Sequence, residues 1–153
     1  MQDLKPCEIH IDEEGEWYHR GNRIIRREIL ELLYEKLDRL PGGEFVLAGG
    51  SESCVLNVAD APFVISRVDL ETKNGKERIV LRLKHLSRRE ILDPKTLRVG
   101  KDNVLYCRVR GGRFAARFSR PAYYQMAEFV KEAAGEEYYI ELNGVRYPLT
   151  ASE

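Results

Sequence analysis

The stretch that decides the fold is Leu56–Leu70, LNVADAPFVISRVDL. It holds two extended segments separated by Asp60-Ala61-Pro62-Phe63. Pro62 has no amide N–H and disfavours helical geometry at the residue before it. The Asp60 carboxylate can accept hydrogen bonds from nearby backbone amides as the chain turns. We therefore predict that one strand ends near Val58 and that a new, long strand starts at Pro62.

The segment after this kink predicts a long antiparallel hairpin. Asn74-Gly75 is a strong signal for a two-residue turn. Taking it as the turn places Val68 opposite Leu81 on an apolar face and Arg67 opposite Arg82 on a charged face. The following residues, 87–101, lack a clear period and are interpreted as a short helical turn plus a linker.

The segments on either side of the hairpin have the same predicted order of elements. Residues 7–58 and 104–149 each read as strand, strand, helix, strand, strand, with helices predicted over Arg26–Leu40 and from Arg120 to about Ala134. The predicted fold class is α+β, with two strand-strand-helix-strand-strand repeats joined by the hairpin. The predicted domains are an N-terminal unit (1–61), the spanning hairpin and linker (62–102) and a C-terminal unit (103–153).

The charges are balanced overall but unevenly distributed. The 153 residues are 43% hydrophobic and 33% charged, with a formal net charge of zero, which argues against a uniformly basic nucleic-acid-binding protein. Arg78–Arg120, however, holds 13 basic and 3 acidic residues. This basic segment is the strongest local anomaly in the sequence.

Several stretches together resemble a known family. They are Trp17-Tyr18 followed by Gly21, the Ile24-x-Arg26 helix start, the tetrapeptide Asp60-Ala61-Pro62-Phe63, and Arg113-x-Ala115-Ala116-Arg117-x-x-Arg120 before Tyr123-Tyr124. In order and spacing, this set resembles the bacterial domain-of-unknown-function family 1285. The resemblance implies a cytosolic α+β protein with repeated motifs, no assigned activity, and a role in signal transduction or small-ligand binding. Its structural motif residues are Trp17, Gly21, Asp60, Pro62 and Phe63.

The arginine-rich hairpin faces are the predicted ligand-binding site. Arginines placed directly opposite one another repel unless an anion or an acidic side chain lies between them. Planar guanidinium groups suit phosphate and carboxylate groups. The candidate binding residues are Arg67, Arg82, Lys84, Arg108, Arg110, Arg117 and Arg120, with Arg113 on the same predicted face as Arg108, Arg110 and Arg117.

Two structural interpretations compete with ligand binding at these arginines. The arginines can pair internally with an acidic helix stripe, which is Glu28, Glu31, Glu35 and Asp38, or they can form a solvated face. Arginine pairs in the structure with that stripe would weaken the ligand interpretation, whereas a compact pocket lined by arginines would favour it.

The sequence shows no motif of an enzyme or a metal site. The three histidines have no paired ligand spacing, and the glycine-rich turns match no phosphate-binding loop, so we predict no catalytic residues, no metal and no cofactor. Cys7, Cys54 and Cys107 lack a CxxC arrangement and are predicted to be buried free thiols. No apolar run has the length of a membrane span, and the predicted location is the cytoplasm.

These observations predict a non-catalytic ligand-binding or regulatory module. The expected partner is a small anionic ligand or a protein. The alternative is a nucleic-acid-binding protein that uses the basic Arg78–Arg120 surface.

Overall fold

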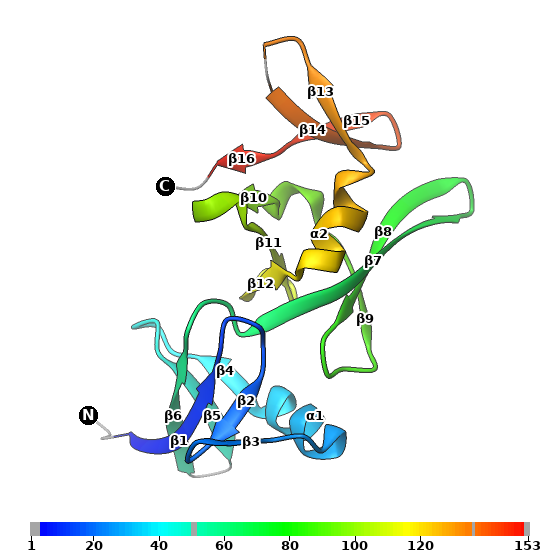
Figure 1. Ribbon diagram of the computed structural model, residues 1–153. Coiled ribbons are helices and arrows are strands. Elements are labelled where there is room, and N and C mark those ends of the chain that lie inside the picture. The colour runs from blue at the N-terminus through cyan, green and yellow to red at the C-terminus, as the bar shows by residue number, and fades with distance from the viewer. Residues whose placement is uncertain (1–3, 50–51, 136, 152–153) are drawn as a thin grey trace. The chain divides into compact units, whose positions relative to one another are not determined.

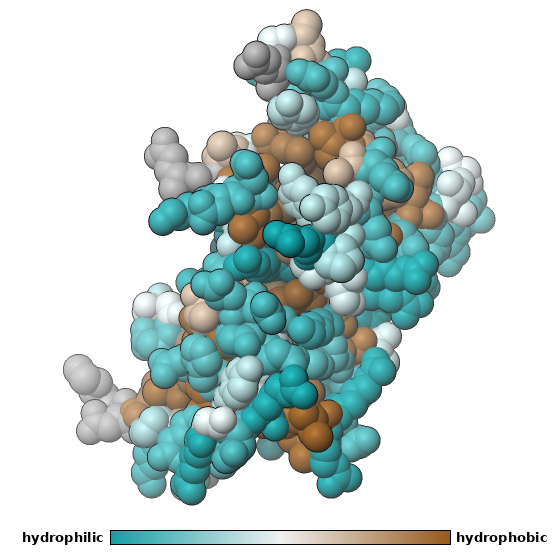
Figure 2. All heavy atoms as spheres, in the orientation of Figure 1, coloured by the Kyte–Doolittle hydropathy of each residue, from teal (hydrophilic) through white to brown (hydrophobic). Residues whose placement is uncertain are grey.

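The structure, a computed structural model, describes residues 4–49, 52–135 and 137–151. The chain forms two compact units, Met1–Pro62 and Phe63–Glu153, so the boundary falls within the Asp60-Ala61-Pro62-Phe63 tetrapeptide (Figure 1). Hydrophilic residues cover most of the face drawn in Figure 2, as the 33% charged composition leads one to expect. In the part of the chain that the structure describes, no helix is long and apolar enough to span a membrane.

The first unit is one six-stranded mixed sheet with one helix, in the strand order β3-β2-β1-β6-β5-β4. Strand β1 pairs antiparallel with β2 and parallel with β6, which places the N-terminal strand inside the sheet. The elements are β1 (Lys5–Ile11), β2 (Trp17–His19), β3 (Asn22–Arg23), α1 (Arg27–Lys36), β4 (Leu37–Arg39), β5 (Phe45–Gly49) and β6 (Glu52–Val58).

The core of this unit connects α1 to the tetrapeptide. Trp17 is fully buried and meets the Tyr34 ring edge-on, with ring centroids 4.9 Å apart. The Tyr34 hydroxyl donates a 2.9 Å hydrogen bond to the Pro62 carbonyl. Because this bond is buried and joins residues 28 positions apart, it fixes the end of the unit against its helix.

Both helices of the structure are shorter than the sequence predicts. Helix α1 ends at Lys36, and the last residues of the predicted helix form β4, in which Leu37 pairs with Leu47. Pro41-Gly42-Gly43 therefore forms the turn of a hairpin rather than the end of a helix. In the same way α2 (Arg120–Ala127) stops early, and Val130–Ala133 becomes β13. Isolated helical periodicity cannot detect these strand partners.

The second unit contains a seven-stranded mixed sheet, ordered β16-β10-β11-β12-β7-β8-β9, and an antiparallel sheet, β13-β14-β15. Strand β7 lies inside the larger sheet, antiparallel to β8 and parallel to β12. The strands are β7 (Phe63–Lys73), β8 (Lys76–Leu83), β9 (Arg89–Ile91), β10 (Arg98–Val99), β11 (Leu105–Val109), β12 (Phe114–Phe118), β13 (Val130–Ala133), β14 (Glu137–Leu142), β15 (Val145–Pro148) and β16 (Thr150–Ala151). The short 3-10 turns η1 (Pro94–Thr96) and η2 (Lys101–Asn103) lie between β9 and β11.

The predicted register of the β7–β8 hairpin is confirmed over most of its length. Val68 pairs with Leu81, and Arg67 lies opposite Arg82. An irregularity follows at Ser66, so that Ile65 pairs with Leu83 instead of with Lys84 as the sequence register requires. This β-bulge brings Ile65, which is completely buried, onto the apolar face.

The predicted α+β class is confirmed, but the two repeats differ in their sheets. In the first, three strands precede α1 and three follow it, whereas in the second, β11 and β12 directly precede α2 and four short strands follow it. The first repeat forms a single sheet, whereas the second is divided between two sheets. The predicted joining hairpin is part of the second unit, because β7 pairs with β12 at Phe63 opposite Ala116.

The cysteine prediction is wrong for two of the three residues. Cys7 on β1 and Cys54 on β6 form a disulfide, with their Cα atoms 5.0 Å apart. The parallel pairing of β1 with β6 brings them together across 47 residues of sequence. Cys107 is a free, buried thiol as predicted. Burial raises its pKa, and the negative charges of Glu90 and Asp93 act in the same direction.

We predict that the protein purified without reductant has a single thiol, Cys107, which reacts with a thiol reagent only after unfolding. Reduction should expose three reactive thiols in denaturant. Removing the cross-link in the Cys7→Ala/Cys54→Ala variant should lower the free energy of unfolding by about 2–5 kcal/mol. Thiol titration and denaturant unfolding measure both effects, and three thiols titrated in unreduced, unfolded protein would contradict the assignment.

An ion pair joins the two strands of the long hairpin. Arg78 Nη2 donates to Glu71 Oε1, and the two residues lie directly opposite each other. Arg89 Nη1 lies 3.5 Å from Glu71 Oε2. The hydrogen bond from Arg78 is the main cause of a lowered Glu71 pKa, with the charges of Arg78, Arg89 and Lys73 adding to it.

The lowered Glu71 pKa predicts a defined acid dependence of stability. A carboxyl whose pKa is lower in the folded state stabilises the fold above its unfolded pKa of about 4.3 and loses this contribution as the pH falls through the folded value. The melting temperature of Glu71→Gln should therefore fall less steeply than that of the wild type between pH 5 and 2. The control is Glu132→Gln, at an exposed position of β13. If the melting temperatures of the two variants fell equally steeply with pH, the prediction would be contradicted.

Candidate anion-binding site

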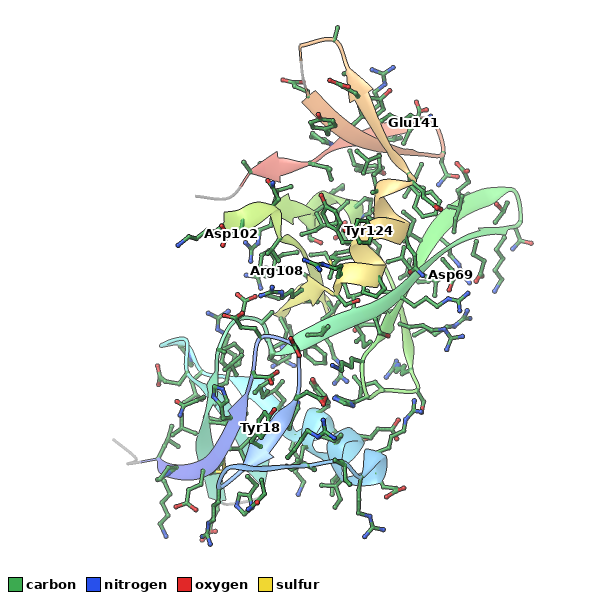
Figure 3. The ribbon with its side chains drawn as sticks, in the orientation of Figure 1. Tyr18, Asp69, Asp102, Arg108, Tyr124 and Glu141 are labelled. Atoms are coloured by element: carbon green, nitrogen blue, oxygen red, sulfur yellow. A yellow bond between two sulfur atoms is a disulfide. The ribbon has the colours of Figure 1, made fainter. Side chains whose placement is uncertain are left out.

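Three arginines lie side by side across the charged face of the second unit. Arg67 on β7 is directly opposite Arg82 on β8, and Arg82 is directly opposite Arg89 on β9. We call this row the arginine ladder. Arg67 pairs with Asp69 on its own strand at 3.1 Å (Figure 3), and Arg89 pairs with Glu71.

The central member of the ladder lacks a counterion. Among the described residues, no hydrogen bond or ion pair engages the Arg82 guanidinium, although its backbone carbonyl accepts a hydrogen bond from the Ser66 hydroxyl. Like charges directly opposite in a sheet destabilise the pairing. The ladder therefore has an unbalanced positive charge at its centre, next to Arg89.

Arg89 also lines a cavity of about 530 Å³ between β9 and the turn that joins β11 to β12. We call it the arginine pocket. Its charged lining is four arginines and one glutamate, and the rest is aliphatic or glycine. The lining residues are Leu83, Leu86, Arg88, Arg89, Glu90, Ile91, Arg110, Gly111 and Arg113. The formal charge of this lining is strongly positive.

The wall of the pocket opposite β9 is a left-handed turn. Arg110, Gly111 and Gly112 have φ values of +55°, +69° and +85°, a conformation that glycine adopts without steric strain. The Arg110 amide donates a 2.8 Å hydrogen bond to Glu90 Oε1, which ties the turn to β9. The guanidinium groups of Arg110 and Arg113 lie over the Phe63 and Phe114 rings, at 5.1 and 5.2 Å. This stacking restrains two arginine side chains at the pocket.

The single carboxylate among the lining residues belongs to Glu90, and only one of its oxygens accepts a hydrogen bond from a described residue. Glu90 Oε1 is used by the Arg110 backbone amide. Glu90 Oε2 is buried and has no hydrogen-bond donor among the described residues. The arrangement can accept a small oxyanion by hydrogen bonds from guanidinium edges.

The other predicted binding residues are not among the residues that line the pocket. Arg108, on β11 (Figure 3), donates to the Gly112 carbonyl at 3.2 Å. Arg117 lies opposite Tyr106 on the β11–β12 hairpin, and Arg120 is the exposed first residue of α2. The expected common face of the β11–β12 arginines is only partly right, because Arg110 and Arg113 belong to the turn. Lys84 follows β8, and its amide bonds to the Val64 carbonyl.

Sequence reasoning missed Arg88 and Arg89, which it placed in a linker. Arg89–Ile91 is instead the edge strand of the sheet, with Glu90 opposite Leu81. The only sequence signal was their position in the most basic segment of the chain, because three residues are too few to show a strand period.

Three of the structural motif residues, Trp17, Gly21 and Phe63, lie in the core or in a turn. Trp17 is buried, Gly21 has a φ of +82° in the turn before β3, and Phe63 is buried against Phe114. Within the residues that the structure describes, no group of three His, Cys, Asp or Glu side chains could hold a metal ion.

No protein-family model and no curated protein matches this chain. Its fold matches that of a DUF1285 family protein from Silicibacter pomeroyi DSS-3 with a TM-score of 0.80 and 22% identity, over 95% of this chain and 81% of that chain. It also matches a DUF1285 family protein from Shewanella baltica OS155 with a TM-score of 0.66 and 20% identity, over 80% of this chain and 91% of that chain. This chain therefore has the fold of the DUF1285 family proteins, in agreement with the resemblance noted in its sequence.

Proposed function

We propose that this protein is a non-catalytic, DUF1285-type regulatory module that binds an anionic ligand in the arginine pocket. The observation that carries the proposal is the lining of that cavity, in which four arginines and one glutamate surround about 530 Å³. A bound oxyanion would accept several charge-assisted hydrogen bonds from these guanidinium groups at once.

The positions of the arginines support a localised anion rather than a long nucleic acid. Arg88, Arg89 and Arg110 converge on a single cavity, and Arg110 is held there by its backbone bond to Glu90. Nucleic-acid binding would draw instead on many dispersed contacts along a phosphate backbone and would weaken steeply with salt. Oligonucleotides therefore serve as a comparison ligand in the test.

The proposal predicts that inorganic pyrophosphate and citrate raise the melting temperature at low salt and bind with a measurable enthalpy. In calorimetric titrations, Arg88→Ala and Arg89→Ala should each weaken pyrophosphate binding by about three- to tenfold, because each removes one partly exposed charge-assisted contact. A neutral sugar should produce no shift.

The matched control is Arg120→Ala, which removes an exposed arginine of the same unit that does not line the pocket. Its pyrophosphate affinity should equal that of the wild type. Equal losses in Arg88→Ala and Arg120→Ala, or no binding of either anion at low salt, would overturn the proposed function. Tighter binding of a single-stranded oligonucleotide, with a steep salt dependence, would favour the nucleic-acid alternative.

A further inference from the structure

The arginine pocket is lined in part by the edge strand of a sheet. Strand β9 is the last strand of the seven-stranded order, and all three of its residues line the pocket. An edge strand offers backbone groups that can pair with another chain. We propose that the natural ligand of the arginine pocket is an extended, acidic peptide segment that adds to β9 as a further strand. This inference rests on the proposed function, because it identifies the anion that the pocket binds.

The register of β9 determines which of its backbone groups face away from the sheet. The Leu92 amide bonds to the Ile79 carbonyl, which continues the pairing of Glu90 with Leu81. In an antiparallel pair, hydrogen-bonded positions alternate. Glu90 therefore directs its amide and carbonyl toward β8, whereas Arg89 and Ile91 direct theirs away from the sheet.

These outward groups have no partner in the described part of the chain. No hydrogen bond to the backbone of Arg89 or Ile91 occurs on their outer side. Strand β8 extends beyond the part that pairs with β9. There, the Asn143 side chain hydrogen-bonds to both the amide and the carbonyl of Glu77. The fold thus caps one part of this edge with a side chain and leaves the arginine-lined part open.

The charges at the edge specify the chemistry of an added strand. A residue paired with Arg89 would extend the arginine ladder, on the same face as Arg82 and Arg67. An acidic residue at that position would convert a row of like charges into a favourable cross-strand pair. Two residues away on the same face lies Ile91, whose side chain is 50% exposed, and an aliphatic residue would cover it.

The geometry therefore points to a peptide with glutamate and an aliphatic residue at alternate positions. Backbone hydrogen bonds would provide the pairing, and Arg89, with Arg82 beside it on the same face, would select the acidic side chains. A free small anion would satisfy the arginines but would leave the outward amides and carbonyls of β9 without partners.

The test uses the full chain and a capped heptapeptide, with glutamate, valine and glutamate at positions 2, 4 and 6 and threonine between them. This order presents the same pattern in either strand direction. The comparison peptide carries N-methyl groups on the valine and on both glutamates, which keeps the charge and removes the amide donors that would face β9 in an antiparallel pairing. Inorganic pyrophosphate is titrated in parallel.

We expect the unmethylated peptide to bind at least about tenfold more tightly than the methylated one, because several backbone hydrogen bonds are lost on methylation. In the complex, amide hydrogen exchange at Arg89 and Ile91 should slow, since both amides face outward in the free protein. Arg120→Ala should bind the peptide as the wild type does.

Equal binding of the two peptides, or unchanged exchange at Arg89 and Ile91, would overturn the inference and leave the anion pocket in place. Binding of pyrophosphate with no binding of either peptide would also overturn the peptide inference and leave the anion pocket in place. Failure of pyrophosphate and both peptides to bind at low salt would overturn the proposed function as well.

Discussion

The second unit depends on the parallel pairing of β7 with β12. Phe63 lies opposite Ala116 at the start of this pairing, while the other edge of β7 pairs antiparallel with β8. Because β7 and β12 run in the same direction, the turn that precedes β12 lies beside the start of β7. Strand β8 runs antiparallel to β7, so β8 ends and β9 begins at this same end of the sheet. The hydrogen bond from the Arg110 amide to Glu90 then joins that turn to β9. The arginine pocket is the space that this arrangement encloses.

The electrostatics of this end of the sheet differ from those of the chain as a whole. The protein has no formal net charge, and several ion pairs among the described residues join nearby positions, as between Arg67 and Asp69 or Arg78 and Glu71. The exposed Arg67–Asp69 pair contributes little to stability, whereas Arg78 and Glu71 are half-buried. The arginine ladder and the arginine pocket meet at Arg89, whose own partner, Glu71, is shared with Arg78. Positive charge therefore accumulates beside an open strand edge.

Local sequence signals predicted much of the fold. The Asn74-Gly75 turn determined the hairpin register, and Val68 does face Leu81. The errors arose wherever a distant partner decided the outcome. Leu37 leaves the helical pattern because Leu47 pairs with it, and Cys7 meets Cys54 because β1 lies parallel to β6. Neither partner can be identified from residue spacing.

The sequence predicted the facing arginines of the hairpin but not the cavity that the structure forms beside them. Arginines opposite one another were expected at Arg67 and Arg82, and the structure has them there. Arg110 was named, but Arg88 and Arg89 were not, since a three-residue edge strand has no readable period. A pocket that joins β9 to the β11–β12 turn exists only once the sheet order is known.

The most direct test of the anion-binding account is a titration of the full-length protein with inorganic pyrophosphate, followed by NMR of the arginine side-chain Nε–H groups. The account predicts that the signals of Arg88, Arg89 and Arg110 shift together and saturate at one ligand per chain. Shifts spread evenly over all exposed arginines, with Arg108 and Arg120 moving as far as Arg89, would contradict it.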